Sequence, residues 1–351
     1  MLNPDLSKFV ITLAKYKALL EDQQQIMKTA SEFRAFYEDD FPLIKTIIQE
    51  ELTGKGFSAE TLSKLRIQHL NIINKPLTRK VSGIYTKDPK RFIKYPEEQI
   101  KDEAGNIKTA ESEKSKAQNE LLMKVLEEFD FSTKVKQALE ISEFFNIALA
   151  MPVFREREDK TNQYSIDILL PDEYVPVSEK DYLLLDKISI LRLDEKKEFY
   201  WLVYTQSQNY IVDMVNNEKD IAGRKKGDRE NVYGIIPIAI LRKKVAGDFY
   251  GQPNWNLYNS QMEADISLTD LRFSETFQHF GIYWGINTNL AANTAFSPNQ
   301  FIDFKQEDPN LPRPELNCLT PQTDFKSLRD NIDWRIDKAQ NLEGIPSSST
   351  S

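Results

Sequence analysis

The sequence predicts an α+β fold in which a helical N-terminal region precedes a largely antiparallel sheet and two long helices flank a small α/β or β module. Apolar residues recur at helical spacing through much of the N-terminal part. The apolar spacing then changes to two in short segments between residues 151 and 240, which is typical of strands. Finally, two amphipathic segments enclose a region rich in Pro and Asn, and this arrangement predicts two helices around a small module.

The N-terminal region, residues 1–93, is expected to be mainly helical. The segment Leu6–Tyr37 has helical apolar spacing and no internal proline. Ser58 is a suitable N-cap for a helix that reaches Ile73, and Pro76 can open a short helix through Val81 to Tyr85. Residues 94–119 have few large apolar side chains and many Lys, Glu, Asp and Ser residues, so they are expected to form a polar, mobile loop.

Residues 120–255 are expected to combine helices with a sheet. Helical spacing continues through Leu121–Phe131 and Ser132–Ala150. Short segments separated by charged or Asn/Gly turns then predict a meandering antiparallel sheet. The predicted strands are Met151–Phe154, Tyr164–Leu169, Tyr174–Val177, Leu183–Leu193, Glu198–Thr205, Tyr210–Val215 and Tyr233–Ile240.

A long amphipathic helix is predicted from about Trp255 to Phe280, roughly 36 Å in length. Its apolar stripe consists of Met262, Ile266, Phe273, Phe277 and Phe280, with Thr269 at the one polar step. The opposite side carries Glu263, Asp265, Asp270, Arg272 and Glu275, and is expected to be exposed. A last helix begins near Thr320 or Thr323 and repeats Phe325, Leu328, Ile332, Ile336 and Ala339. The intervening strand candidates are Ile282–Ile286, Gln300–Phe304 and Glu315–Leu319.

Composition argues against several classes of function. The formal net charge of −8 predicts no general attraction to nucleic acid or to an anionic membrane. A single cysteine, Cys318, excludes an intramolecular disulfide and a multi-cysteine zinc site. No apolar run approaches the roughly 20 residues of a membrane span. We therefore expect a chain without membrane contact, made in a reducing cytoplasm.

The strongest enzyme-like pattern is that of a metal-dependent nuclease, with Asp172 and Glu195 as magnesium ligands and a lysine nearby. Residues 194–197, however, lie between two strand-like segments and are more typical of a hairpin tip. The Gly223–Gly227 segment lacks the Gly-Lys-Ser/Thr ending of a phosphate loop. His69 and His279 lie in predicted helices without a second ligand at metal-binding spacing. No catalytic, cofactor or metal residue is therefore predicted.

Aromatic residues gather in the module between the two long helices. Five of them lie in a region too small to bury them all: Tyr283, Trp284, Phe296, Phe301 and Phe304. Stacking on single-stranded nucleic acid favours interleaved basic residues. Because Lys305 and Arg313 are the only basic residues from Gly281 to Thr323, contact with another protein is the better interpretation.

The order of these segments resembles the portal proteins of tailed bacteriophages. The resemblance begins near Asn71 and rests on short motifs in a fixed order: Asn71–Pro76, Val81–Tyr85, Met151–Phe154, Ile168–Val177, Tyr233–Lys244, the long helix and its module, and Leu342–Pro346. It implies a wing up to residue 255, a first stem helix at 256–280, a clip at 281–320, a second stem helix at 321–345 and a flexible tail at 346–351. Portal proteins usually continue into a tunnel loop, further wing elements and a helical crown, whereas this sequence stops at Ser351; either it is a fragment, or those parts are absent or supplied otherwise.

The resemblance implies a structural protein without enzymatic activity or cofactor. Portal subunits form a homo-oligomeric ring at one capsid vertex, through which double-stranded DNA passes without sequence-specific binding. Expected partners are the terminase large subunit, the head-to-tail adaptor and the major capsid or scaffolding protein, with assembly in the bacterial cytoplasm and a final location in the virion.

The resemblance also assigns two sets of residues. The stem residues, which would face the channel or a neighbouring subunit, are Met262, Glu263, Ile266, Asp270, Phe273, Glu275, Phe277, Phe325, Arg329, Ile332 and Ile336. The clip residues, which would dock partners, are Tyr283, Trp284, Phe296, Phe301, Phe304 and Arg313. Two alternatives remain: a metal-dependent nuclease, and an adaptor or scaffold module without a channel.

Overall fold

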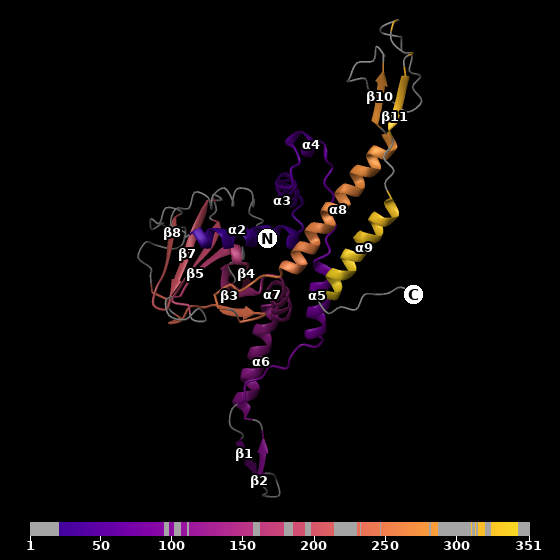
Figure 1. Ribbon diagram of the computed structural model, residues 1–351. Helices are drawn as coiled ribbons and strands as arrows, with labels where there is room; N and C mark the ends of the chain where they lie inside the picture. Colours follow the sequence, from indigo (N-terminus) through magenta and orange to yellow (C-terminus); the bar gives the residue numbers. More distant parts are fainter. Residues whose placement is uncertain are drawn as a thin grey trace. The chain divides into compact units, whose positions relative to one another are not determined.

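The computed structural model combines helices with antiparallel sheets, which confirms the predicted α+β class (Figure 1). It describes residues 21–94, 98–101, 107–110, 112–156, 162–178, 185–193, 198–213, 230–231, 233–245, 247–280, 282–286, 310, 313, 315–319 and 324–342. The chain divides into two compact units: unit 1 is Met1–Ile47, Asn71–Asn259 and Ala339–Ser351, and unit 2 is Ile48–Leu70 and Ser260–Lys338. Within the described residues, no helix is both long and apolar enough to cross a membrane.

In the described part of the N-terminal region, from residue 21 on, the helices are α2 (Glu21–Glu38), α3 (Phe41–Gly54), α4 (Ala59–Lys64) and α5 (Asn74–Ile84). Helix α2 matches the described half of the predicted Leu6–Tyr37 helix, and residues 6–20 lie outside the described residues. Helix α3 was not predicted. It follows a tight turn at Asp39, which has a φ of 62°, and it tolerates Pro42 because the first turn of a helix does not need that amide.

The predicted polar loop at residues 94–119 is wrong in its secondary structure. Strands β1 (Glu98–Lys101) and β2 (Ile107–Ala110) form an antiparallel hairpin there, and α6 (Glu113–Glu128) begins eight residues earlier than expected. Ser112 caps α6, because its hydroxyl accepts a hydrogen bond from the Lys114 amide at 3.3 Å. Helix α7 (Phe131–Phe145) follows, and Asn146, whose φ of 69° is left-handed, caps its end. The predicted Ser132–Ala150 helix is therefore too long, because residues 147–150 belong to a strand.

In the described part of residues 147–242, two antiparallel sheets replace the single meandering sheet that was predicted. The first has the order β4-β3-β9, formed by β3 (Ile147–Glu156), β4 (Asn162–Leu169) and β9 (Ala239–Arg242). After the short helix η1 (Pro171–Glu173), the second sheet runs in sequence order through β5 (Tyr174–Val177), β6 (Lys187–Leu193), β7 (Phe199–Thr205) and β8 (Asn209–Asp213).

The strand predicted at Tyr233–Ile240 is mostly wrong, because only Ala239 and Ile240 of that segment belong to β9. Residues 233–235 instead form a turn that Asn231 holds. The Asn231 Nδ2 atom donates to the carbonyl oxygens of Thr205 at 2.8 Å and Ile235 at 2.7 Å. These bonds satisfy main-chain groups that a longer strand would have paired with a neighbour.

An aromatic cluster in unit 1 fixes the beginning of α8 (Trp255–Phe280). The ring of Phe33 from α2 stacks on that of Tyr258 at a centroid distance of 4.3 Å and meets Phe144 of α7 at 5.0 Å. The Asn254 amide also donates to the Phe144 carbonyl oxygen at 2.8 Å. These contacts join α2, α7 and the first turn of α8 into one core.

The remaining elements are β10 (Ile282–Ile286), β11 (Glu315–Leu319) and α9 (Phe325–Leu342). The bounds of α8, β10 and β11 agree with the sequence prediction. Helix α9 begins after Asp324, which accepts hydrogen bonds from the Lys326 and Ser327 amides at 3.1 Å. The strand predicted at Gln300–Phe304 lies outside the described residues.

Candidate functional site: helices α8 and α9 and the β10–β11 module

Two helices of unit 2, α8 and α9, run antiparallel to each other (Figure 1). Ion pairs bridge them. Arg329 of α9 donates to Glu275 of α8 at 3.3 Å, and Arg335 pairs with Glu263. The Arg329 side chain is 65% exposed and that of Glu263 is 57% exposed. Exposed pairs of this kind contribute about 0 to 1 kcal/mol each, so they orient the two helices more than they stabilise them.

The predicted stem residues are only partly buried. In unit 2, Ile332 is buried, whereas Glu263, Asp270 and Arg329 are exposed. The half-buried members of the set are Met262, Ile266, Phe273, Glu275, Phe325 and Ile336. Phe277 lies in the last turns of α8. The stripe inferred from apolar spacing is therefore not the most buried side of α8.

A polar row forms the most buried side of α8 in unit 2. Gln261 and Asp265 are 0% exposed and Thr269 is 1% exposed, and their spacing of four aligns them along the helix. Each one bonds to the main chain of residues 68–70. The Gln68 amide donates to Thr269 Oγ1 at 3.0 Å, the Leu70 amide donates to Asp265 Oδ1 at 3.0 Å, and Gln261 Nε2 donates to the Leu70 carbonyl oxygen at 2.8 Å.

This arrangement corrects two expectations. Asp265 was expected on the exposed face but is buried, because it binds the chain of residues 68–70. The predicted Ser58–Ile73 helix stops at Lys64. Residues 65–72 are not helical, and the α8 side chains satisfy amides that a helix would have bonded internally. Each residue turns a helix by about 100°, so Ile266 lies a quarter turn from Asp265.

His69 belongs to the same polar network. Its Nδ1 atom lies 2.6 Å from Oδ2 of Asp265, so the carboxylate fixes the orientation of the imidazole ring. Within the described residues, no group of three or more His, Cys, Asp or Glu side chains could hold a metal ion. The geometry therefore assigns this pair a positioning role, in which one side chain of α8 holds two successive residues of a non-helical segment.

The predicted clip residues are only partly described. Strands β10 and β11 pair antiparallel, with Tyr283 opposite Cys318 and Trp284 opposite Asn317. Arg313 is exposed. Phe296, Phe301 and Phe304 lie outside the described residues. A two-stranded hairpin is at best marginally stable in water, so the β10–β11 pair alone provides a weak core.

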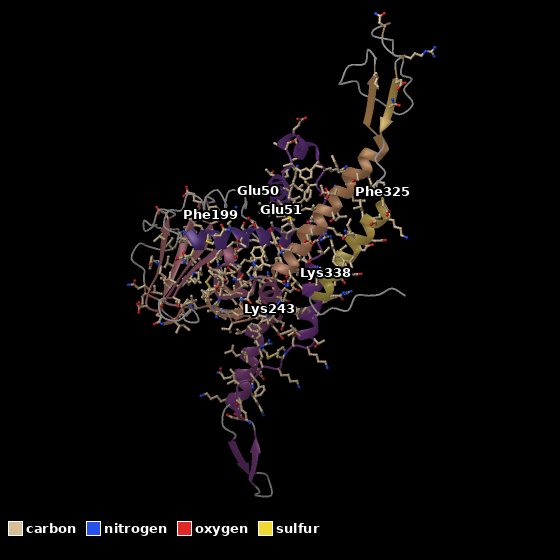
Figure 2. The ribbon with its side chains drawn as sticks, in the orientation of Figure 1. Glu50, Glu51, Phe199, Lys243, Phe325 and Lys338 are labelled. Carbon is tan, nitrogen blue, oxygen red and sulfur yellow. The ribbon has the colours of Figure 1, made fainter. Side chains whose placement is uncertain are left out.

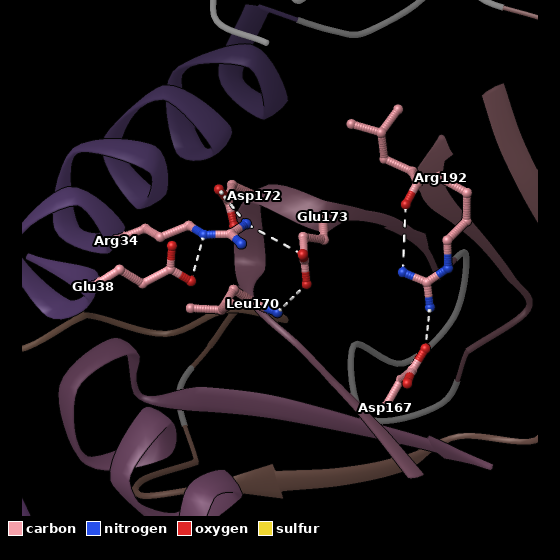
Figure 3. A network of polar contacts seen from close by, with 8 residues as sticks. Arg34, Glu38, Asp167, Leu170, Asp172, Glu173 and Arg192 are labelled. Carbon is pink, nitrogen blue, oxygen red and sulfur yellow. Dashed lines mark hydrogen bonds and ion pairs between the residues drawn. The ribbon is translucent and has the colours of Figure 1, made fainter. Parts of the chain in front are cut away.

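The carboxylate proposed for a nuclease, Asp172, is enclosed by an ion-pair network in unit 1 (Figure 3). The Arg34 Nη1 atom lies 3.3 Å from Asp172 Oδ2 and 3.2 Å from Glu173 Oε1, while Arg34 Nε lies 3.0 Å from Glu38. Asp172 is 0% exposed. Glu195 lies outside the described residues, as does the Gly223–Gly227 segment.

Burial sets the charge state of this network. It is the largest cause of a rise in the pKa of Asp172 to about 7, which Arg34 opposes and Glu173 supports. A magnesium ligand needs an ionised oxygen that is open to the ion and its water. Asp172 instead has a guanidinium partner and no exposed surface, and this arrangement opposes the nuclease hypothesis.

Two residues that position the chain before α8 were missed by the sequence analysis. Asn146 is 4% exposed, and its Nδ2 atom donates to the carbonyl oxygens of Lys244 at 3.2 Å and Tyr250 at 3.1 Å. The Tyr250 hydroxyl donates to the Tyr174 carbonyl oxygen at 3.0 Å. An asparagine directly after an apolar helix is a sequence signal for a left-handed cap. The partners of the Asn146 side chain, however, are distant in the sequence, and no motif predicts them.

Comparison of the sequence with known proteins gives no assignment. No protein-family model matches the chain, and no curated protein matches it.

Proposed function

We propose that this chain is the subunit of a portal-like ring, a structural conduit for DNA at a capsid vertex. One observation carries the proposal: in unit 2, antiparallel helices α8 and α9 lead into and out of the paired strands β10 and β11. This is the order expected for a first stem helix, a clip and a second stem helix. The terminase large subunit and the head-to-tail adaptor would then dock on the β10–β11 module, and capsid or scaffolding protein would contact the wing.

The exposure of α9 supports packing between subunits. Most of its side chains are exposed, including Trp334 at 56%, whose ring lies under the Lys338 ammonium at 4.9 Å. A large aromatic side chain on a rigid helix is a typical anchor in a protein interface. Helix α9 in Figure 2 extends from Phe325 past Lys338, which provides a continuous surface for a neighbouring copy.

The ion pairs change the role proposed for two acidic residues. Glu263 and Glu275 face Arg335 and Arg329, so much of their negative charge is balanced within the chain. We therefore propose that they align the stem helices. Asp270 is the better candidate for a surface that repels DNA, because it is exposed. The exposure is partial: neighbouring atoms desolvate the Asp270 carboxylate enough to raise its pKa, and Lys55 opposes that rise.

An adaptor module without a channel is the second candidate. The observation that favours it is that α8 and α9 are bridged within one chain, by Glu275 with Arg329 and by Glu263 with Arg335. Such a module needs no ring to hold the two helices together.

Electron microscopy of the purified full chain separates these functions. The portal proposal expects rings with a central hole and cyclic symmetry. A strictly monomeric chain at all concentrations, also with added capsid and motor proteins, contradicts it. Small oligomers without a hole support the adaptor. Magnesium-dependent cleavage of DNA that is lost in Asp172→Asn would instead support the nuclease.

A further inference from the structure

A basic segment stands out in this acidic chain. Residues 74–94 contain seven Lys and Arg side chains and a single acidic side chain, Asp88, although the whole chain has a formal charge of −8. Lys75 and Arg79 are exposed on α5, and Lys87 and Lys90 are exposed in the segment that follows it. The rest of the sequence is correspondingly acidic.

Glu143 joins this segment to a second group of lysines. Its Oε2 atom lies 2.7 Å from Lys80 Nζ on α5 and 2.8 Å from Lys243 Nζ, which follows β9 (Lys243 is labelled in Figure 2). Burial alone would raise the pKa of Glu143, but hydrogen bonds from Lys243 and Lys80 lower it below its ordinary value. One carboxylate therefore holds two ammonium groups side by side. Lys244, which follows Lys243 in the chain, is exposed.

The segment after α5 is fastened to α6 and α7. The Asn119 side chain binds the Ile93 main chain twice, accepting from its amide and donating to its carbonyl oxygen at 3.2 Å. Arg91 donates to the Tyr85 hydroxyl at 2.7 Å and lies 4.6 Å from the centre of the Phe131 ring. Because these contacts order the backbone, binding a partner would cost little conformational entropy.

Two large apolar side chains are exposed within the same segment. Ile84, at the end of α5, is 61% exposed, and Phe92 is 68% exposed. Lys and Arg residues lie on both sides of each residue in the sequence, and the core does not cover either side chain. A surface that combines positive charge with exposed apolar side chains fits a protein surface that is acidic and partly apolar.

We propose that the basic face, defined as residues 74–94 with Lys243 and Lys244, docks on an acidic surface of a second copy of this chain. Charge complementarity favours this occupant, because residues 74–94 carry a formal charge of +6 in a chain of −8, so the rest of the sequence carries −14. Ile84 and Phe92 favour a protein over a phosphodiester backbone, which offers no aliphatic partner. The inference rests on the proposed ring, in which unlike faces of neighbouring copies meet around the circle.

Sedimentation velocity of the full chain and two charge variants tests the basic face. The test variant is K87E/K90E, and the control is K45E/K116E, which changes the net charge equally at exposed lysines outside the face. We expect K87E/K90E to weaken self-association by about tenfold or more, and K45E/K116E to change it by less than about threefold. Raising NaCl from about 50 to about 500 mM should weaken wild-type association in the same direction. The F92S variant tests whether the exposed aromatic side chain contributes to self-association, and circular dichroism checks that the variant is folded.

The possible results separate a failure of the basic-face inference from a failure of the proposed ring. Rings that form equally well from wild type and K87E/K90E overturn this inference and leave the proposed function intact. A wild-type chain that stays monomeric at every concentration contradicts the ring itself. Duplex DNA binding that is lost in K87E/K90E while self-association is unchanged assigns the face to nucleic acid and overturns docking of a second copy.

Discussion

The imidazole Nδ1 atom of His69 lies 2.6 Å from Oδ2 of Asp265, and the two side chains are 7% and 0% exposed. The other carboxylate oxygen, Oδ1, accepts the amide of Leu70 at 3.0 Å. One buried side chain of α8 therefore holds two successive residues of a non-helical segment that is distant in sequence. This requires that residues 65–70 are not helical, since a helix there would turn the amide of Leu70 away.

Replacing Asp265 with alanine should destabilise unit 2 by about 2 to 4 kcal/mol, because it leaves the His69 ring and the Leu70 amide without their buried acceptor. Urea unfolding followed by fluorescence measures the change. The control is Asp270→Ala on the same helix, where an exposed carboxylate should contribute less than about 1 kcal/mol. Equal losses of unfolding free energy in the two variants would show that the buried network stabilises unit 2 no more than an exposed carboxylate does.

Thr269→Val should have a more local effect than Asp265→Ala. It keeps the shape of the side chain but removes the acceptor of the Gln68 amide, so we expect a loss of about 1 to 2 kcal/mol. Hydrogen exchange should accelerate at Gln68 and change less at Leu70, whose acceptor is Asp265. Uniform acceleration at both amides would argue against separate side-chain anchors.

Elements that short sequence patterns mark at both ends were predicted correctly. The bounds of α8, β10 and β11 agree with the prediction because glycine, proline and regular apolar spacing mark them. The spacing of Leu62, Leu65 and Leu70 imitated a helix, although the structure ends α4 at Lys64. The charged stretch at residues 113–120 has good helix propensity but no apolar stripe, so its place in α6 was missed.

The candidate site was less predictable than the fold. The burial of Asp265 depends on residues 68–70, which are about 195 positions away in the sequence. No sequence motif in either segment predicts that they make contact. The same holds for Arg34, whose partners Asp172 and Glu173 follow a strand of the sheet region. Polar residues at helical spacing are usually solvated, and only tertiary structure distinguishes a buried polar row from an exposed one.

Protonation of Asp172 should make unit 1 more stable in mild acid than at alkaline pH. Its pKa is raised by burial from 3.8 to about 7, so the folded state binds this proton more tightly than the unfolded chain. The contribution is complete below about pH 4 and is lost as the pH rises through 7. Between these limits the slope from this group approaches about 1.4 kcal/mol per pH unit. Unfolding free energies from pH 5 to 8 measure it.

The Asp172→Asn variant is the control for this pH dependence. The amide keeps the shape of the carboxyl group and has no proton to lose, so its stability should vary less over the same range. Arg34, Glu38 and Glu173 remain in both proteins, which isolates the titration of residue 172. A wild-type protein whose stability rises steadily from pH 5 to 8 would contradict the expected direction.

The ion pair between Glu275 and Arg329 should contribute little to the stability of unit 2. Arg329 is 65% exposed, and solvent screens the attraction. A double-mutant cycle with Glu275→Ala and Arg329→Ala should give a coupling energy below about 1 kcal/mol. Salt should reduce it further. A coupling above about 2 kcal/mol would mean that the pair is shielded from water in the assembled protein.

Trp334→Ala should weaken self-association while leaving the isolated chain nearly as stable as before. The side chain is 56% exposed, so truncation removes few contacts within the chain and should change its unfolding free energy by less than about 1 kcal/mol. If α9 packs against a neighbouring copy, an aromatic anchor at this position contributes about 2 kcal/mol or more, or roughly thirtyfold in affinity. Ile235→Ala removes a side chain that is 64% exposed in unit 1 and serves as the matched control. Sedimentation equilibrium of the three proteins compares them directly, and equal affinities for all three would exclude this face of α9 from the interface.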